Sequence, residues 1–263
     1  MKKAAIVFSS IILIFFISCK KDGPDPGKLK VDFIELVDGY PMVIDSMKYI
    51  NEAGNSYMIS EIQYFISKLT IYYSDGNSYT VQSDLGIHYI DSDIEESHTW
   101  NVTDNIPAGE VDSVVFVFGM DEETNQSNIF TDPPESNMFW PEELGGGYHY
   151  MKLNGRWMDP DLFVLPFNFH LGIGQTYDTT GQVTGFIQNY FRVNPYLMFN
   201  SVEPQILPGQ TAGITIYMHI DSWFRSPNTW DFNDWGGMMM QNQEALQAAC
   251  ENGHDAFTYK FDD

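Results

Sequence analysis

Apolar and polar side chains alternate along most of the chain that follows residue 27. In residues 28–37, Leu29, Val31 and Phe33 share one side, while lysine and aspartate side chains occupy the other. A period of two places successive side chains on opposite faces, so the pattern predicts a half-buried β-strand. Residues 111–120 are almost continuously apolar, which is typical of a central strand. Similar patterns predict strands at residues 57–73, 148–155, 161–174, 186–193 and 212–220.

The many short strands, with Gly, Pro, Asn and Asp between them, predict an all-β fold. We expect an antiparallel β-sandwich of the immunoglobulin-like or Greek-key type, with one short C-terminal helix. That helix is predicted at residues 236–253, because side chains recur there every three or four positions and Asn252-Gly253 ends the pattern. Composition does not shift within residues 28–263, so this region is expected to form a single domain.

The first residues predict export to the cell envelope. Residues 1–18 combine two lysines with an apolar stretch too short to span a bilayer comfortably, as in a signal peptide. Ser18 directly precedes Cys19, which is the pattern of a bacterial lipoprotein cleavage site; an ordinary signal peptide with an incidental cysteine is the alternative. Residues 19–27 would then be the lipidated Cys19 and a flexible tether rich in Pro and Gly. The start resembles lipoproteins of Bacteroidetes-type bacteria, which implies an outer-membrane anchor on the periplasmic or the surface face.

Composition narrows the class of protein further. Of the two cysteines, lipidation of Cys19 would leave Cys250 without a partner in its own chain, so no disulfide is expected. Without Lys2 and Lys3, 36 acidic side chains face 11 basic ones, a formal charge of −25 that disfavours nucleic acid. The sequence contains no nucleophile elbow, His-Glu-x-x-His helix, phosphate-binding loop or Cys-x-x-Cys pair. We therefore expect a binding protein rather than an enzyme.

Histidines are the candidates for chemistry, and three of the six, His149, His170 and His219, fall inside predicted strands. A strand holds a ligand rigidly, as a metal site needs, although a single histidine is more often a surface or packed residue. Neutral imidazole and methionine thioether suit copper, whereas oxygen-rich sites suit calcium. Met151, two residues after His149, could supply the thioether. Because imidazole must be neutral to bind, copper affinity is expected to fall below about pH 6.5.

Strand parity indicates which of these side chains can converge. His170 and His219 each alternate with the apolar residues of their strands, so both are expected on faces away from the core. His149 shares its side with Met151 and Leu153, which places it on the core face unless a bulge follows the three glycines. A pair of His170 and His219 with another ligand is therefore easier to build than a site of three histidines.

A series of short motifs runs in order through most of residues 30–260. The motifs are "FISKLTIY", "VFGMDEETN", Met138-Phe139-Trp140, a glycine-tyrosine pair, "KLNG" and His170-Leu171-Gly172. The ordered set resembles the MbnP-like family of exported bacterial copper-binding proteins. The resemblance implies a β-sandwich that binds copper, usually with a di-haem partner of the cytochrome c peroxidase type. Asn154 stands where the family usually has Glu, and the second tryptophan that commonly follows Met-x-Trp is absent.

The same resemblance implicates Trp140, because in related copper proteins two histidines and an oxidised tryptophan (kynurenine) hold the ion. Our leading hypothesis is a lipid-anchored envelope protein that binds copper, with His170 and His219 as first ligands and His149, Met151 or a modified Trp140 as a third. The alternative is a metal-free surface module that binds glycan or protein. Trp223, Trp230 and Trp235 could then serve as stacking platforms, unless they pack beneath a loop.

Overall fold

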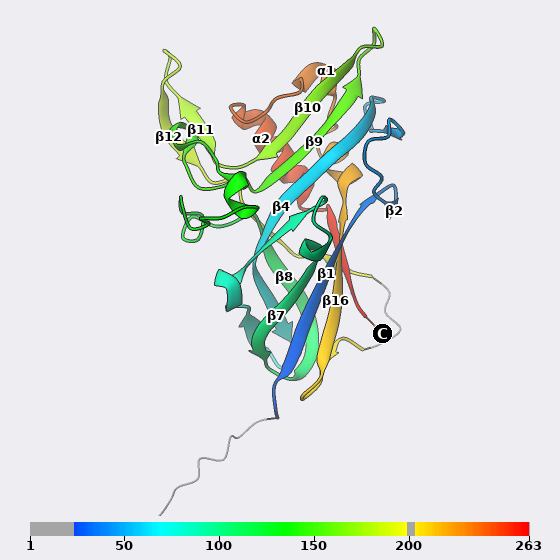
Figure 1. The fold of residues 1–263 in the computed structure, drawn as a ribbon, viewed down its shortest axis with the longest axis vertical. Coiled ribbons are helices and arrows are strands. Elements are labelled where there is room, and N and C mark those ends of the chain that lie inside the picture. The colour runs from blue at the N-terminus through cyan, green and yellow to red at the C-terminus, as the bar shows by residue number, and fades with distance from the viewer. Residues whose placement is uncertain (1–23, 199–202, 263) are drawn as a thin grey trace, which may run out of the picture.

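A computed structural model describes residues 24–198 and 203–262 of the chain. The expected signal peptide and Cys19 lie outside the described residues. Within the described ranges, no helix is both long and apolar enough to cross a membrane. The molecule is built mainly from two large β-sheets, and one of its strands, β4 (Ser56–Tyr73), runs along much of its length (Figure 1).

The first sheet has six strands. They are β1 (Gly27–Val37), β2 (Tyr40–Pro41), β7 (Thr99–Ile106), β14 (Tyr196–Leu197), β16 (Thr211–His219) and β17 (Phe257–Phe261). Five of them are ordered β14–β17–β16–β1–β2, and β7 also pairs with β1. Burial alternates strictly along β1, so the period of two seen in the sequence is confirmed there.

The second sheet has nine strands and is organised around β4. The others are β3 (Tyr49–Ile50), β5 (Ser78–Thr80), β6 (Ile87–Asp91), β8 (Gly109–Phe118), β9 (Met151–Met158), β10 (Val164–Leu171), β13 (Phe191–Val193) and β15 (Gln205–Ile206). The central path is β10–β9–β4–β8–β13, which makes β9 and β10 neighbours at one end of the sheet (Figure 1).

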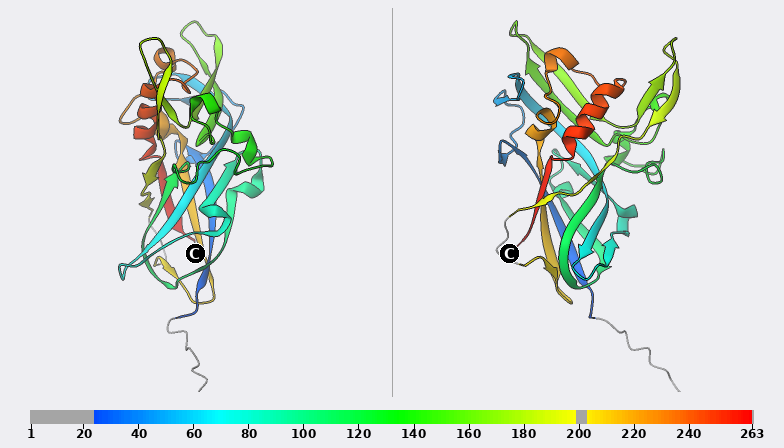
Figure 2. Two further views of the ribbon diagram at one scale, coloured as in Figure 1. Left: turned by 90° about the vertical axis from the view of Figure 1, so that its left-hand side faces the viewer. Right: turned by 180° about the vertical axis from the view of Figure 1, so that it is seen from behind.

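A two-stranded hairpin of β11 (Gly174–Tyr177) and β12 (Val183–Ile187) projects from the upper part of the molecule (Figure 1). The helices are α1 (Phe232–Trp235) and α2 (Gln243–Gly253), and α2 is seen in front when the molecule is viewed from behind (Figure 2). The short 3-10 helices are η1 (Ser83–Gly86), η2 (Glu95–His98), η3 (Glu135–Met138), η4 (Glu142–Leu144) and η5 (Ile220–Phe224).

One hydrophobic core contains side chains from both large sheets. Val31 and Phe33 of β1 are buried in it together with Ile62 of β4 and Phe116 of β8. Burial of this much apolar surface is the main force that holds two sheets together. The expected mostly β fold with few helices is therefore confirmed, while the immunoglobulin-like connectivity stays a prediction.

Two strand pairs run parallel, so the expectation of a purely antiparallel sandwich was wrong in this respect. β1 pairs in parallel with β16, from Lys28 opposite Thr211 to Leu36 opposite His219, and β14 pairs in parallel with β17. A tight turn makes consecutive strands antiparallel, but β1 and β16 are separated by most of the chain and are free of that constraint.

The C-terminal helix is shorter than the sequence pattern predicts. α2 begins at Gln243, and Asn242 is its N-cap, with the side-chain oxygen accepting a hydrogen bond from the Ala245 amide. A capping asparagine competes with helix continuation on its N-terminal side, so the methionines before it lie outside the helix. The predicted end at Asn252-Gly253 is confirmed.

Candidate metal centre

His170 lies on the outward face of the paired strands β9 and β10. From Phe167 onward its strand alternates between buried and partly exposed residues, and Phe169 and Leu171 on either side point into the core. The cross-strand neighbour of His170 is Lys152 on β9, whose side chain shares the outward face. The position of His170 away from the core face was thus predicted correctly by parity.

His149 lies beside His170, which corrects the expectation that its side chain faces the core. The two imidazole rings meet edge to face, with centroids 5.1 Å apart and an interplanar angle of 85°. Parity failed because β9 begins only at Met151, so residues 148–150 do not continue its alternation. The His149 amide instead donates to the Met138 carbonyl at 2.6 Å.

The three glycines permit this arrangement. Gly145, Gly146 and Gly147 all have positive φ, a conformation that glycine adopts without steric cost. They turn the chain so that the Trp140 amide donates to the Gly147 carbonyl at 2.8 Å. The loop therefore brings Trp140 and His149 together from either side of the turn.

Trp140 forms a wall of the site. Its side chain is fully buried, and its ring centroid lies 4.6 Å from that of His149, in an edge-to-face contact. The indole Nε1 donates to the Leu144 carbonyl at 3.1 Å, which fixes the ring. The chain also comes close to this ring at Gly172, where an added Cβ would lie 2.5 Å from the indole Cε3.

One nitrogen of each imidazole is engaged by the protein. His149 Nδ1 lies 2.9 Å from the Met138 carbonyl oxygen, and His170 Nε2 lies 2.8 Å from Asn154 Oδ1. His170 Nδ1 is inaccessible to solvent and has no hydrogen-bond partner among the residues that the structure describes. A buried polar atom without a partner is costly, and a ligand at Nδ1 would remove that cost.

Burial keeps both histidines neutral. Desolvation, aided by the neighbouring His170, lowers the pKa of His149 to about 3. Desolvation, aided by the positive charge of Lys152, lowers the pKa of His170 to about 4. Neutral imidazole is the form that ligates a metal, so both side chains are ready to bind at neutral pH.

The other predicted ligands lie elsewhere. His219 is on β16 of the first sheet, where its Nε2 lies 2.9 Å from Thr258 Oγ1 on β17. Met151 is fully buried in the core between Tyr64 and Leu171 on the neighbouring strands, on the opposite face of β9 from Lys152. The structure therefore brings together His149, His170 and Trp140, and it leaves His219 and Met151 outside this group.

A ring spacing of 5.1 Å fits a shared ion. With metal–nitrogen distances of about 2 Å, the centroids of two imidazoles on one ion lie roughly 5–6 Å apart. Two imidazoles in a largely apolar, buried setting are donors that suit copper or zinc, rather than calcium or magnesium. The unpartnered Nδ1 and the ring spacing are compatible with a bound copper ion.

Sequence reasoning missed two residues behind His170. Asn154 Nδ2 donates to Glu61 Oε2 at 2.9 Å, and Asn154 Oδ1 contacts the His170 ring. Asn154 has the outward parity of Lys152 in "KLNG", and this shared face was the signal that could have linked it to His170. Glu61 could not be found this way, because β4 carries a register shift between Ile59 and Glu61.

An acidic cluster lies near Asn154. Carboxylate oxygens of Glu61, Asp91 and Asp93 lie within 4.8 Å of one another, a grouping that could hold a hard cation. Asp91 Oδ2 already accepts hydrogen bonds from Gln63 at 2.9 Å and Tyr89 at 2.6 Å. Its oxygens are therefore satisfied by the protein, unlike the imidazole nitrogen of His170.

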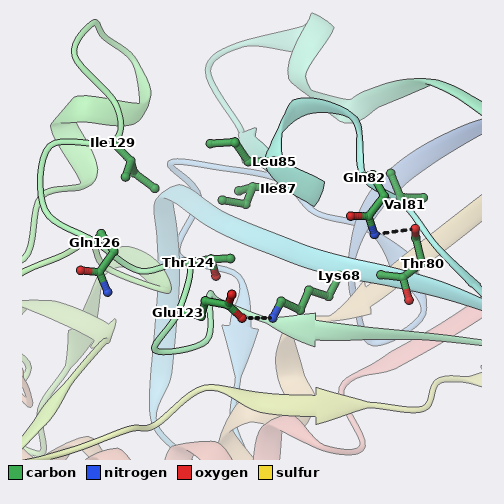
Figure 3. A pocket seen from close by; sticks show the side chains of 10 residues that line it. All are labelled: Lys68, Thr80, Val81, Gln82, Leu85, Ile87, Glu123, Thr124, Gln126 and Ile129. Carbon is green, nitrogen blue, oxygen red and sulfur yellow. Dashed lines mark hydrogen bonds and ion pairs between the residues drawn. The ribbon is translucent and has the colours of Figure 1, made fainter.

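The described surface offers little that could bind a glycan by stacking. Trp223 and Trp230 are buried, and the half-buried Trp235 stacks on Trp230, so the loop tryptophans pack inward. A surface pocket of about 560 Å³ lies between β4 and the loop after β8 (Figure 3). All ten residues that line it are aliphatic, polar or charged, and Lys68 pairs there with Glu123 at 3.7 Å.

Comparison with known proteins identifies the family of this chain. The family model described as MbnP matches residues 26–241. The chain belongs to the MbnP family. MbnP from Methylosinus trichosporium has a similar structure, with a TM-score of 0.53 over 90% of this chain and 99% of that one, at 12% sequence identity. At that identity the likeness shows the fold alone, and no curated protein matches the sequence.

Membership bears on the sequence predictions. MbnP proteins are regarded as copper-binding proteins rather than catalysts, which agrees with the expected class. The predicted resemblance is confirmed at the level of the family.

Proposed function

We propose that this MbnP-family chain binds one copper ion between His149 and His170. The observation that carries the proposal is the buried pair of adjoining imidazoles, of which His170 offers a nitrogen without a protein partner. Cu(I) suits a site with few, soft-to-intermediate ligands in an apolar setting, where hydration cannot compete. Copper bound there would be held by the outer face of β9 and β10 and by the loop that carries Trp140.

Trp140 becomes a ligand only after modification. An indole Nε1–H donates and has no lone pair to offer a metal, and here it is already bonded to the Leu144 carbonyl. Oxidative cleavage of the indole C2–C3 bond, with two oxygen atoms taken from a peroxide or dioxygen oxidant and C2 lost as formate on hydrolysis, would give kynurenine, with an amine and a ketone beside His149. Family membership and the 4.6 Å contact between the Trp140 and His149 rings support this role.

Copper binding can be measured on the processed chain, residues 19–263 with Cys19→Ser. The purified protein is titrated with Cu(I) under reducing, anaerobic conditions against a chromogenic Cu(I) chelator, and bound metal is counted by mass spectrometry. We expect one ion in the wild type, at least a tenfold loss of affinity in His149→Ala and His170→Ala, and little change in His219→Ala. Retention of copper by the His149→Ala, His170→Ala double variant would exclude this site.

We propose in addition that Cys19 is acylated and anchors the protein at the outer membrane. The Ser18-Cys19 junction after a short apolar stretch supports this placement. Expression in a bacterial host with a labelled fatty acid should give a membrane-bound, labelled protein, and Cys19→Ala should release both label and protein. An unlabelled wild-type protein in the soluble fraction would contradict the anchor.

The partner proposed for this chain is a di-haem protein of the cytochrome c peroxidase type. Family membership supports it, and such a protein could supply the oxidising equivalents that modification of Trp140 needs. Co-expression with a neighbouring di-haem peroxidase gene should change the mass of the peptide that contains Trp140. The matched control is Trp140→Phe, whose peptide should keep its mass.

A further inference from the structure

Three side chains on neighbouring strands form a hydrogen-bonded row across the outward face of the second sheet. Glu61 is on β4, Asn154 is opposite it on β9, and His170 is on β10. Asn154 Nδ2 donates to Glu61 Oε2 at 2.9 Å, and His170 Nε2 lies 2.8 Å from Asn154 Oδ1. The row ends at the imidazole that adjoins His149.

Donor and acceptor chemistry fixes the direction of this row. A carboxylate oxygen only accepts hydrogen bonds, so the amide nitrogen of Asn154 must face Glu61. The amide oxygen of Asn154 must then face His170, and an amide oxygen also only accepts. His170 Nε2 is therefore the ring nitrogen that carries the hydrogen, and Nδ1 carries the lone pair.

The opposite tautomer would be strongly disfavoured. It would set the lone pair of Nε2 against the oxygen of Asn154, and it would bury an Nδ1–H without an acceptor. Leaving a buried donor unsatisfied costs about 1–3 kcal/mol. The row thus selects one tautomer even in the protein without metal.

We propose that Asn154, oriented by Glu61, is a positioning residue that holds His170 in the Nε2–H tautomer and makes Nδ1 its metal-binding atom. The inference rests on the proposed copper site, because it assigns the ligand atom of one of its histidines. Residues that hold the second nitrogen of a ligating histidine fix its orientation and commonly change metal affinity by about 10- to 100-fold.

Glu61→Gln is the sharpest test. It keeps the size and polarity of the side chain, but it no longer forces Asn154 to present its amide nitrogen to residue 61. A glutamine can present either its amide nitrogen or its oxygen, so Asn154 becomes free to turn and to donate to His170. Asn154→Leu removes the acceptor altogether. Asn168→Leu is the matched control: it lies on β10 two residues from His170, and it is the cross-strand partner of Asn154.

The first readout needs no copper. Long-range proton–nitrogen NMR of the 15N-labelled processed chain distinguishes the protonated ring nitrogen of His170 from the unprotonated one. We expect an Nε2–H signature in the wild type and in Asn168→Leu, and a mixture of tautomers in Glu61→Gln and Asn154→Leu. If His170 is Nδ1–H in the wild type, or if Glu61→Gln and Asn154→Leu both keep the wild-type tautomer, the proposal is wrong.

The second readout is Cu(I) affinity by chelator competition. Both row variants should bind about 10- to 100-fold more weakly than the wild type, and Asn168→Leu should bind equally well. Unchanged copper affinity in Glu61→Gln and Asn154→Leu would overturn the positioning role. If the wild type binds no copper, the proposed function fails, but the NMR of the metal-free protein still decides whether Glu61 and Asn154 set the tautomer. Should Asn154→Leu not fold, the tautomer of the wild type and the copper affinity of Glu61→Gln decide.

Discussion

The imidazole rings of His149 and His170 lie edge to face, 5.1 Å apart, although strand parity places them on opposite faces of the sheet. One comes from the regular strand β10, and the other from the segment between a triple-glycine turn and β9. Both rings are desolvated, and the pKa of each is lowered, to about 3 for His149 and about 4 for His170. Because the two rings are buried and close together, we expect effects on the pH dependence of copper binding and of stability.

Copper affinity should be nearly constant from pH 7.5 down to about pH 5. Protons compete with a metal for an imidazole only near or below its pKa, and here burial keeps both pKa values at about 4 or lower. This revises the expectation of a decline below about pH 6.5, which assumed ordinary histidines. Chelator competition across this pH range tests it, and a tenfold loss of affinity between pH 7 and pH 5.5 would contradict a buried site.

The metal-free protein should lose stability as the pH falls from about 6.5 to about 4. In this window the unfolded chain binds protons at both histidines, while the folded chain keeps them neutral, so protonation favours unfolding. A shift from 6.5 to about 4 at His170 corresponds to about 3 kcal/mol. The slope of unfolding free energy against pH, measured in urea, should be smaller in His170→Asn. Equal slopes in the two proteins would show that His170 titrates normally.

The pair of His98 and Glu35 should have the opposite pH dependence. His98 Nε2 lies 3.1 Å from Oε2 of the buried Glu35, and this hydrogen bond raises the pKa of His98. Stability from the pair is fully present below the unfolded value of about 6.5 and is lost as the pH rises through the raised folded value. Urea unfolding at pH 6 and pH 9 should therefore show a loss that His98→Gln lacks. Since His98 is partly exposed, we expect no more than about 1 kcal/mol.

The sequence predicted the structure well where apolar and polar residues alternate regularly, and poorly where they do not. Strands with a clear period, such as 28–37, 57–73 and 111–120, were placed to within two residues, and the outward position of His170 followed from parity. His149 was misplaced because a turn with three positive-φ glycines breaks the alternation just before it. The start of α2 was misplaced because the three- and four-residue spacing continues through the methionines before Asn242, although asparagine is a preferred N-cap residue. Side-chain geometry across strands, as between Glu61 and Asn154, depends on register, which a single sequence does not show.

Gly172→Ala should disturb the wall of the site. An added Cβ would lie 2.5 Å from the indole ring of Trp140, which cannot move away because it is fully buried. Overpacking of this kind costs typically about 1–3 kcal/mol, and here it would also displace the indole that contacts His149. We expect a lower urea midpoint and weaker copper binding. Gly185→Ala in the exposed hairpin is the control, since its nearest neighbour is a threonine hydroxyl at 3.0 Å; equal effects of the two substitutions would argue against a tightly packed indole.

Met151→Leu should leave copper binding unchanged. The Met151 side chain is fully buried on the core face of β9, whereas Lys152 and Asn154 next to it share the outward face with His170. A thioether in that position packs between the sheets and cannot reach the imidazole pair without inverting the strand. Leucine has nearly the same volume, so the substitution should cost less than about 1.5 kcal/mol in stability. Cu(I) affinity, measured by chelator competition with His170→Ala in parallel, separates a packing role of Met151 from a role as ligand. A loss of copper in Met151→Leu comparable to that in His170→Ala would make Met151 a ligand. It would also require a site on the core face of β9.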